Sequence, residues 1–157
     1  MMRSFVWGAI IEAVRSLILV LLAATVSAQT APPQCFEYEP KVVHITGRIE
    51  RQAFPGPPNY SNIKDGDRRD VQWILHLSRS LCVNGKRDDE LNSESEVDIK
   101  EIQLVIMNVG DWKRYARLIG RNVQVTGTLF HAYTAHHRTS VLLSVQIIEQ
   151  QTSHSKK

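Results

Sequence analysis

The chain has 157 residues, of which 43% are apolar and only 7% aromatic, and its formal net charge is +3. This length predicts one small domain. The slightly negative mean hydropathy excludes a membrane protein with many spans. The basic residues are barely in excess and are not gathered into a stripe, so the charge pattern argues against nucleic-acid binding.

The first 28 residues have the pattern of a secretory signal peptide. Arg3 and Arg15 supply positive charge, and an apolar run, LILVLLAATV, occupies residues 17–26. Val26-Ser27-Ala28 has the small residues of a cleavage site, with Ala28 as the last residue removed. The apolar run is short for a bilayer, which needs about 20 residues.

An uncleaved anchor helix that starts at Val6 is the alternative, although Glu12 and Arg15 interrupt it. Cleavage would remove Arg3, Arg15 and Glu12, which lowers the net charge of residues 29–157 to about +2. We therefore expect a periplasmic or secreted protein with no membrane span after signal cleavage.

Two cysteines, Cys35 and Cys82, follow the predicted signal peptide. An even number of cysteines in an exported chain predicts a disulfide. In the chain-entropy model, a loop of this size would stabilise the fold by roughly 3–4 kcal/mol. Two buried thiols and a metal-binding pair are the alternatives, and the absence of C-x-x-C spacing argues against a metal or redox motif.

Five segments show the period-two alternation of half-buried strands. They lie at residues 41–50, 71–78, 97–107, 123–129 and 141–147. Gly47 interrupts the first, where it predicts a bulge or a sharp coil. In the second, Gln72, Ile74 and His76 are predicted to face outward. In the third, the apolar residues change parity after Val97 and Ile99, which predicts a bulge near Lys100 and Glu101.

Residues 111–119 change to helical period, with Trp112, Tyr115, Ala116 and Ile119 on one face. Asn108 or Asp111 can cap the start, and Gly120 suits the left-handed position after the end. The order therefore predicts a mainly β domain at residues 41–150, an OB-fold-like five-stranded Greek-key barrel with one short helix between strands 3 and 4. A small sandwich with one helix is the alternative.

The remaining segments carry no predicted regular element. Residues 29–40 hold three prolines and predict an extended lead-in, and residues 151–157 predict a disordered tail. Residues 52–70 form a long loop rich in proline, and loops of this length are often functional. Residues 84–96 are charged and predict a solvated, flexible loop.

Several motifs resemble the bacterial domain-of-unknown-function 4431 family over about residues 35–148. They are CFEYEP at 35–40, FPGPPNY at 54–60, WILHLS at 73–78, EIQLVI at 101–106 and GTLFHAYTAHHRTSVLL at 127–143. The resemblance implies an exported bacterial domain with this fold and brings no activity with it. Where the family leads us to expect glycine the chain has Ala135, and Arg138 stands in place of a third histidine, which argues against a metal site.

Two loops supply the candidate binding residues, because OB-folds bind ligands near the loops that join strands 1 and 2 and strands 4 and 5. We expect the topology to bring these two loops to the same end of the barrel. Rigid prolines lower the ordering cost of a binding loop. The predicted ligand-binding residues are Phe54, Tyr60, Asp65, Asp67, Gln72, His76, His131, Tyr133, His136, His137 and Arg138.

Structural roles are the alternatives for several of these residues. Phe54 could plug the core, and His131 has the parity of a buried rim histidine. A zinc site would need three or four converging ligands. His131 with His136 or His137, and Asp65 or Asp67, would be such a set. Adjacent histidines point apart in an extended segment, however, and Asp-Gly-Asp is ordinary turn chemistry.

The preferred hypothesis is a non-catalytic binding module without a cofactor. Its partner would be an envelope protein, a peptide, a glycan or a small ligand, and one version is an inhibitor or immunity-type partner of a cell-envelope enzyme. No G-x-S-x-G, H-E-x-x-H or catalytic-cysteine pattern is present in the sequence. The alternative is a metal-dependent hydrolase that uses His131, His136 and His137. A nucleic-acid-binding OB module is the third hypothesis.

Overall fold

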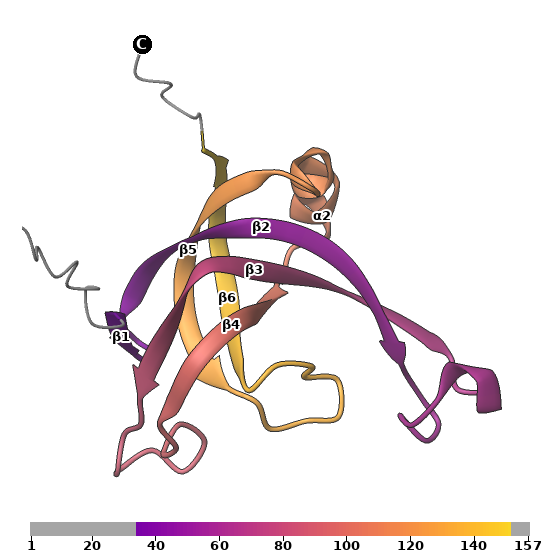
Figure 1. The fold of residues 1–157 in the computed structure, drawn as a ribbon, viewed down its shortest axis with the longest axis horizontal. Helices are drawn as coiled ribbons and strands as arrows, with labels where there is room; N and C mark the ends of the chain where they lie inside the picture. The colour runs from indigo at the N-terminus through magenta and orange to yellow at the C-terminus, as the bar shows by residue number, and fades with distance from the viewer. Residues whose placement is uncertain (1–33, 152–157) are drawn as a thin grey trace, which may run out of the picture. The chain divides into compact units, whose positions relative to one another are not determined.

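The computed structural model describes residues 34–151, so the predicted signal peptide and residues 152–157 of the predicted tail lie outside it. Within this range the chain forms six strands, one α-helix and two short 3-10 helices (Figure 1). Their bounds are β1 Gln34–Glu37, β2 Val42–Pro55, η2 Ile63–Asp65, β3 Arg69–Asn84, β4 Glu96–Val105, α2 Val109–Tyr115, η3 Ala116–Leu118, β5 Asn122–His131 and β6 Val141–Gln150. The prediction of a mainly β domain with one short helix is confirmed.

Strand pairing runs in a closed cycle through five of the six strands. β2 pairs with β3 and β5, β6 pairs with β5 and β4, and β4 pairs with β3. The β4–β6 pair is parallel, and the other four pairs of the cycle are antiparallel. Helix α2 stands between β4 and β5 in the chain, as the sequence predicts.

The core contains the inward residues of all five strands of the cycle. The alternation that predicts the strands also predicts their buried positions, because successive side chains of a strand point to opposite faces. Tyr115 and Leu118, which follow the start of the helix, are buried in the same core, and Trp112 packs edge-to-face against Trp73 with ring centroids 4.8 Å apart. Strand residues of this core include Val43, Ile45, Leu75, Ile102, Leu104, Val123, Val125 and Leu143.

Two glycines allow strands to approach one another closely. A Cβ atom at Gly47 would lie 2.5 Å from the carbonyl oxygen of His76, and one at Gly127 would lie 2.0 Å from that of Ser144. Gly47 and the next residue, Arg48, are the two positions at which β2 pairs with both β3 and β5. The register of the β5–β6 pair shifts between Thr126 and Gly127. Gly47, where the sequence predicts a bulge or a sharp coil, and Gly127 are therefore both positions at which two strand backbones come very close.

The helix ends follow the predicted signals. The side chain of Asn108 accepts a hydrogen bond from the Gly110 N–H and caps α2 at its start. Gly120 has a φ of 76°, a left-handed value that glycine adopts at little cost. The predicted helix at residues 111–119 is thus α2 followed by the 3-10 turn η3.

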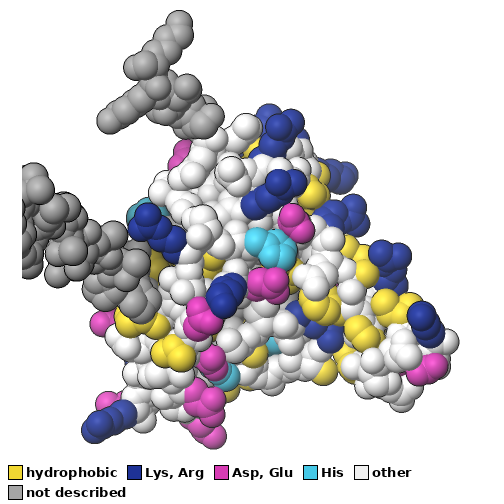
Figure 2. Space-filling model, viewed as in Figure 1, with side chains coloured by type: hydrophobic (Ala, Val, Ile, Leu, Met, Phe, Trp, Pro, Cys, Tyr) yellow, Lys and Arg dark blue, Asp and Glu magenta, His cyan; other side chains and the backbone are white. Residues whose placement is uncertain are grey.

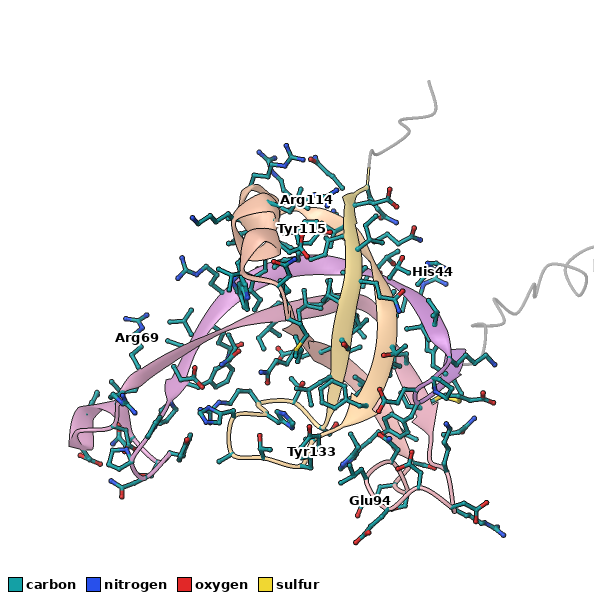
Figure 3. The ribbon with its side chains drawn as sticks, turned by 180° about the vertical axis from the view of Figure 1, so that it is seen from behind. His44, Arg69, Glu94, Arg114, Tyr115 and Tyr133 are labelled. Carbon is teal, nitrogen blue, oxygen red and sulfur yellow. A yellow bond between two sulfur atoms is a disulfide. The ribbon has the colours of Figure 1, made fainter. Side chains whose placement is uncertain are left out.

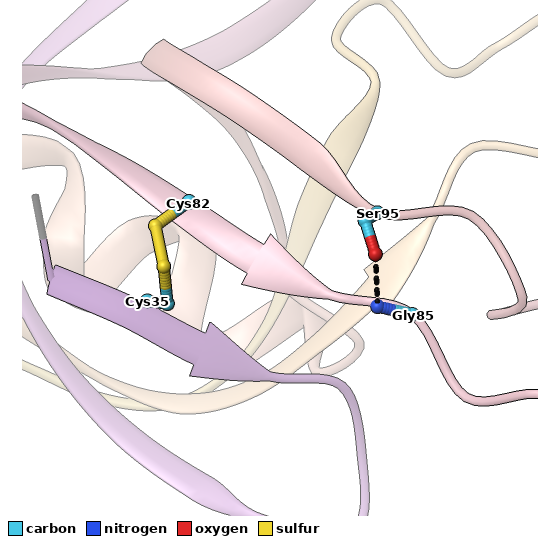
Figure 4. The surroundings of a disulfide bond; sticks show 4 residues. All are labelled: Cys35, Cys82, Gly85 and Ser95. Atoms are coloured by element: carbon cyan, nitrogen blue, oxygen red, sulfur yellow. Dashed lines mark hydrogen bonds between the residues drawn. A yellow bond between two sulfur atoms is a disulfide. The ribbon is translucent and has the colours of Figure 1, made fainter.

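The predicted extended lead-in at residues 29–40 contains a regular element that the sequence did not indicate, because residues 34–37 form strand β1. This strand pairs in parallel with β3, with Cys35 opposite Cys82. A disulfide joins these two cysteines, whose Cα atoms are 4.3 Å apart, so the predicted disulfide is confirmed (Figure 4). Close by, the Gly85 N–H donates a hydrogen bond to Ser95 Oγ at the start of the β3–β4 connection (Figure 4).

The start of β4 also differs from prediction. Val97, predicted to face inward, is 76% exposed, whereas Ile99 is buried. The left-handed conformation of Asp98, with φ of 52°, separates the two. The β3–β4 register then shifts. Glu101 of β4 pairs with His76 of β3, but Ile99, two residues earlier, pairs with Leu81, five residues further along β3. The predicted irregularity therefore lies at this position, with its extra residues in β3.

Within the described part of the chain, no helix has both the length and the apolar character that a membrane crossing requires.

Candidate functional site

Past the closed cycle of strands, β2 and β3 continue as a two-stranded arm, which comprises residues 51–73. In this arm residues 51–55 pair with residues 69–73, and neither run pairs with another strand. Figure 1 shows the paired strand ends running away from β4, β5 and β6, and Figure 3 labels Arg69 on the arm. The predicted long loop is thus shorter than expected, because strand structure continues to Pro55 and resumes at Arg69.

The carboxylate of Asp67 organises the turn at the end of the arm. It accepts hydrogen bonds from the backbone N–H groups of Asn59, Ser61 and Asn62 at 2.8, 2.7 and 2.9 Å. These bonds, first among them the one from Asn59, stabilise the charged form and lower the pKa of Asp67 to about 2. Asp65 accepts a hydrogen bond from Asn62 Nδ2 in the same turn. The interpretation of these aspartates as turn residues is therefore the one that the geometry supports.

The arm meets the β5–β6 connection at a set of contacts that we call the loop junction, consisting of Tyr60, Asp70, His136 and Arg138. The Tyr60 hydroxyl lies 3.0 Å from His136 Nε2. The Arg138 guanidinium donates to Asp70 Oδ2 at 2.9 Å and to the Pro55 carbonyl oxygen at 2.7 Å. The expectation that the two loops meet is confirmed by these contacts.

Arg138 is the centre of the loop junction. Its side chain is only 10% exposed, and its guanidinium carbon lies 5.4 Å from the Phe54 ring centroid and 5.5 Å from that of Tyr60. Phe54 is half-buried against this guanidinium and does not belong to the core cluster, so it does not plug the core. His136 Nδ1 lies 3.8 Å from Asp70 Oδ2, on the exposed side of the pair. Two aromatic rings and one carboxylate thus hold a single cation.

A glutamine pair connects the loop junction to the strands beneath it. Gln72 Nε2 donates to Asp70 Oδ1 at 2.8 Å, and Gln103 Nε2 donates to Gln72 Oε1 at 3.2 Å. Gln103 also accepts from the Arg138 N–H and donates to the His136 carbonyl oxygen. The β5–β6 connection therefore lies over the outer face of β4 at Gln103.

This arrangement corrects the prediction for Ile74, which was expected on an open outer face. Ile74 is fully buried, and so is Leu142. Both residues are strand partners of Gln103 and share its face of the sheet. The face that was predicted to bind a ligand is covered at this point by the chain's own loop.

His76 lies on the same strand but apart from the loop junction. Its two ring nitrogens face Glu50 Oε2 at 3.6 Å and Glu101 Oε1 at 3.2 Å. It is half-buried between two glutamates of neighbouring strands, which agrees with its predicted outward direction.

Tyr133 and His137 of the β5–β6 connection belong to an aromatic group with Phe130 of β5. Their rings are edge-to-face at 4.7 Å, and the Phe130 ring lies 5.6 Å from that of His137. The Tyr133 N–H donates to His137 Nδ1. Burial, and then the neighbouring His136, lower the pKa of His137. A cavity of about 280 Å³ lies beside the group, lined by Leu91, His131 and Tyr133 among others.

His131 does not join His136 and His137. It lies with Glu94 and Glu96, and we call these three residues the acidic cluster. His131 Nε2 is 3.0 Å from Glu96 Oε1 and 3.8 Å from Glu94 Oε2. Among the described residues, this is the one group of three or more His, Cys, Asp or Glu side chains whose ligand atoms all lie within 4.8 Å of one another. The histidine set of the hydrolase hypothesis is therefore not assembled.

Sequence reasoning missed Glu94 and Glu96, which it placed in a flexible charged loop. Their spacing held a signal, since residues two apart share a face where a strand begins. Figure 3 labels Glu94 on the β3–β4 connection, and acidic side chains gather over this connection in Figure 2. Asn92 fastens the connection to β5, because its Oδ1 accepts the His131 N–H at 2.9 Å.

Tyr38 lies beside the acidic cluster. Its side chain is fully buried, and its ring is edge-on to that of His131 with centroids 6.2 Å apart. Burial raises the pKa of Tyr38 to about 12, and the negative charges of Glu96 and Glu94 contribute to the rise. Its hydroxyl has no hydrogen-bond partner among the described residues.

These features define a small, mainly β domain, closed by one disulfide and carrying a projecting arm. Residues 101–149 match the family described as domain of unknown function (DUF4431). This match agrees with the family resemblance of the motifs, and it covers the second half of β4 together with α2, β5 and nearly all of β6. The arm and the two glutamates of the acidic cluster lie before the matched residues. No curated protein matches the chain.

Proposed function

We propose that this protein is an exported, non-catalytic binding module that docks its arm and the adjoining β5–β6 connection into a cell-envelope protein. The proposal includes an OB-fold barrel, which is supported by the closed pairing cycle of β2, β3, β4, β6 and β5 and by the helix between β4 and β5. The ligand-binding roles of the residues named from the sequence are part of this proposal.

Two features support the compartment. The first 28 residues have the charge, apolar run and cleavage pattern of a signal peptide, as the sequence predicts. The Cys35–Cys82 disulfide is of a kind that persists in oxidising compartments such as the periplasm and the extracellular space. The two together support a periplasmic or secreted location as part of the proposal.

The observation that carries the proposal is the rigid connection of two projecting segments. Asp67 holds the turn of the arm through three backbone N–H groups, and Arg138 fixes the β5–β6 connection to Asp70 of the arm. Segments held in one conformation before binding lose less entropy when a partner docks. A projecting surface of this kind suits the cleft of a protein better than it suits a small ligand, which is usually enclosed in a pocket.

Charge favours an acidic partner surface. Lys64, Arg68 and Arg69 are exposed on the arm, whereas the carboxylate of Asp67 is occupied by backbone N–H groups and that of Asp70 by Arg138. The negative charges of Asp65 and Asp67 offset only part of this positive charge. Complementary charges speed association and select partners more than they add affinity. We therefore expect a cleft lined with acidic residues in the partner.

The test is capture from an envelope extract followed by binding of the purified partner. The immobilised chain should recover a protein that the Tyr60→Ala/His136→Ala and Arg68→Ala/Arg69→Ala variants recover poorly, and the affinity of the purified partner should fall by at least tenfold, roughly 1.4 kcal/mol, for each. Lys113→Ala/Arg117→Ala, which removes exposed basic residues at α2 and η3, is the matched control and should bind normally. Equal affinity of all four proteins for every recovered partner would exclude this surface.

A further inference from the structure

The acidic cluster has the composition and spacing of a metal site. We propose that Glu94, Glu96 and His131 bind one divalent transition-metal cation, which zinc represents in the test. His131 Nε2 is 3.0 Å from Glu96 Oε1 and 3.8 Å from Glu94 Oε2. Ligands of a tetrahedral zinc ion with bonds of about 2.0–2.1 Å lie roughly 3.3 Å apart. The two observed separations bracket this value, so a small movement of exposed Glu94 would complete the geometry.

The orientation of the His131 ring leaves its Nε2 facing the carboxylates. Nδ1 lies 3.0 Å from the Ala132 carbonyl oxygen, which can only accept a hydrogen bond, so Nδ1 carries a hydrogen. In the neutral ring Nε2 then presents a lone pair to a carboxylate oxygen 3.0 Å away. Two acceptors at this distance require a proton or a metal cation between them. Metal-bound histidines commonly donate their other N–H to a backbone carbonyl, as His131 does here.

The buried hydroxyl of Tyr38 is a second, independent observation. Its side chain is fully buried, the hydroxyl has no hydrogen-bond partner among the described residues, and the ring is edge-on to His131. Buried polar groups are nearly always hydrogen bonded, so an unpaired one indicates that a partner belongs at this place. The cation, or a water molecule bound to it, would supply that partner beside the acidic cluster.

The donor types select the class of cation. One imidazole nitrogen with carboxylate oxygens suits zinc and similar transition metals, whereas calcium and magnesium prefer oxygen ligands alone. The ion would link the end of the β3–β4 connection to His131, the last residue of β5. The same two segments are already linked by the hydrogen bond from the His131 N–H to Asn92 Oδ1. The side chain of Glu94 is 75% exposed and leaves a path from solvent.

The chain offers a matched comparison within itself. His76 also faces two glutamates, Glu50 and Glu101, but it presents a different ring nitrogen to each of them. No single nitrogen of His76 therefore shares a cation with both carboxylates. The Glu101→Gln variant removes a carboxylate 3.2 Å from a histidine nitrogen without touching the acidic cluster.

The test is calorimetric titration of the purified full chain, treated first with chelator, with zinc alone. We expect about one zinc per chain, and a loss of at least tenfold in affinity in both the Glu96→Gln and His131→Gln variants, since even outer-shell changes cost about 10–100-fold. Glu101→Gln should bind as the unaltered chain does, and calcium should not compete. Nitrogen-15 spectra of the unaltered chain should show zinc on His131 Nε2 with Nδ1 still protonated.

Two results would overturn the proposal. One is a folded chain that binds no zinc, in which case a proton alone joins His131 to Glu96. The other is zinc binding that the Glu96→Gln variant leaves intact, with no change at His131 Nε2 in the spectra. The spectra need no variant, so the proposal can fail even where a substitution disturbs the fold. The proposed arm surface is independent of this outcome, because its test alters none of the three ligands.

Discussion

The loop junction and the acidic cluster lie at the two ends of the same β5–β6 connection, and they balance charge in opposite ways. In the loop junction, Arg138 donates to Asp70 at 2.9 Å, and an arginine is always charged. In the acidic cluster, Glu94 and Glu96 face one histidine nitrogen, whose charge depends on a proton. The chain therefore supplies its own cation at the loop junction, whereas the carboxylates of the acidic cluster would be balanced by a proton on His131 or by the proposed metal ion.

The largest expected effect is the loss of the built-in cation. Arg138→Met removes a guanidinium that is only 10% exposed and leaves Asp70, at 19%, without its ion-pair partner. Breaking a buried ion pair from one side costs roughly 3–5 kcal/mol, because the remaining charge stays buried. Urea unfolding should show this loss in the free energy of unfolding.

Arg117→Met, at an exposed arginine, is the control for this change and should be near neutral. If Arg138→Met lowers the free energy of unfolding by less than about 1 kcal/mol, the loop junction behaves as an exposed ion pair and the contrast with the acidic cluster disappears.

The next effect is the dependence of stability on pH through Asp67, whose carboxylate is held by backbone N–H groups and not by a cation. The pKa of Asp67 falls from 3.8 to about 2 in the folded chain, so the folded state binds its proton more weakly than the unfolded state does. Its contribution to stability is therefore fully present above pH 3.8 and is lost as the pH falls towards about 2. Urea midpoints measured across this range should fall less steeply in Asp67→Asn than in the unaltered chain.

Asp65→Asn removes a neighbouring exposed carboxylate and should keep the steep fall with pH. Parallel pH profiles for the unaltered chain and Asp67→Asn would show that the three backbone N–H groups do not hold the charge of Asp67.

The smallest expected effect is at the exposed side of the loop junction. Tyr60→Phe removes the hydroxyl that lies 3.0 Å from His136 Nε2 and keeps the ring against Arg138. A single hydrogen bond of this kind contributes about 0.5–1.5 kcal/mol. Thermal unfolding should show a loss in the free energy of unfolding near the low end of this range. Tyr133→Phe, at an exposed tyrosine, is the control. A loss as large as that of Arg138→Met would show that the Tyr60–His136 contact, and not Arg138, contributes most to the stability of the loop junction.

Much of the fold could be predicted because local patterns reflect local geometry. Val123, Val125 and Leu129 are buried at every second position, as their alternation predicts. The helix start at Asn108 and the left-handed Gly120 follow from the preferences of those residue types. The meeting of the two loops, which Tyr60 and His136 show, follows from the strand order alone.

The features that could not be predicted depend on contacts between distant segments. Alternation gave the direction of Ile74 but not the loop that lies over it. The exposure of Val97 was not predicted, because Asp98 adopts a left-handed conformation that few non-glycine residues adopt. No spacing rule relates Glu96 to His131, which lies 35 residues further along the chain. For the same reason, the sequence grouped His131 with His136 and His137, whereas in the structure His131 lies with Glu94 and Glu96.

Reduction of the Cys35–Cys82 disulfide would do more than remove a crosslink, because it would also expose an edge of β3. Beyond Leu77, where its pairing with β2 ends, β3 has β4 along one edge and β1 along the other. Strand β1 has only four residues, and Cys35 ties it in place. After reduction this short strand could dissociate, which would expose the backbone N–H and C=O groups of residues 81–84. Exposed strand edges pair with strands of other chains. We therefore expect the reduced protein to aggregate during synthesis in a reducing compartment, so that its solubility reports on where it folds.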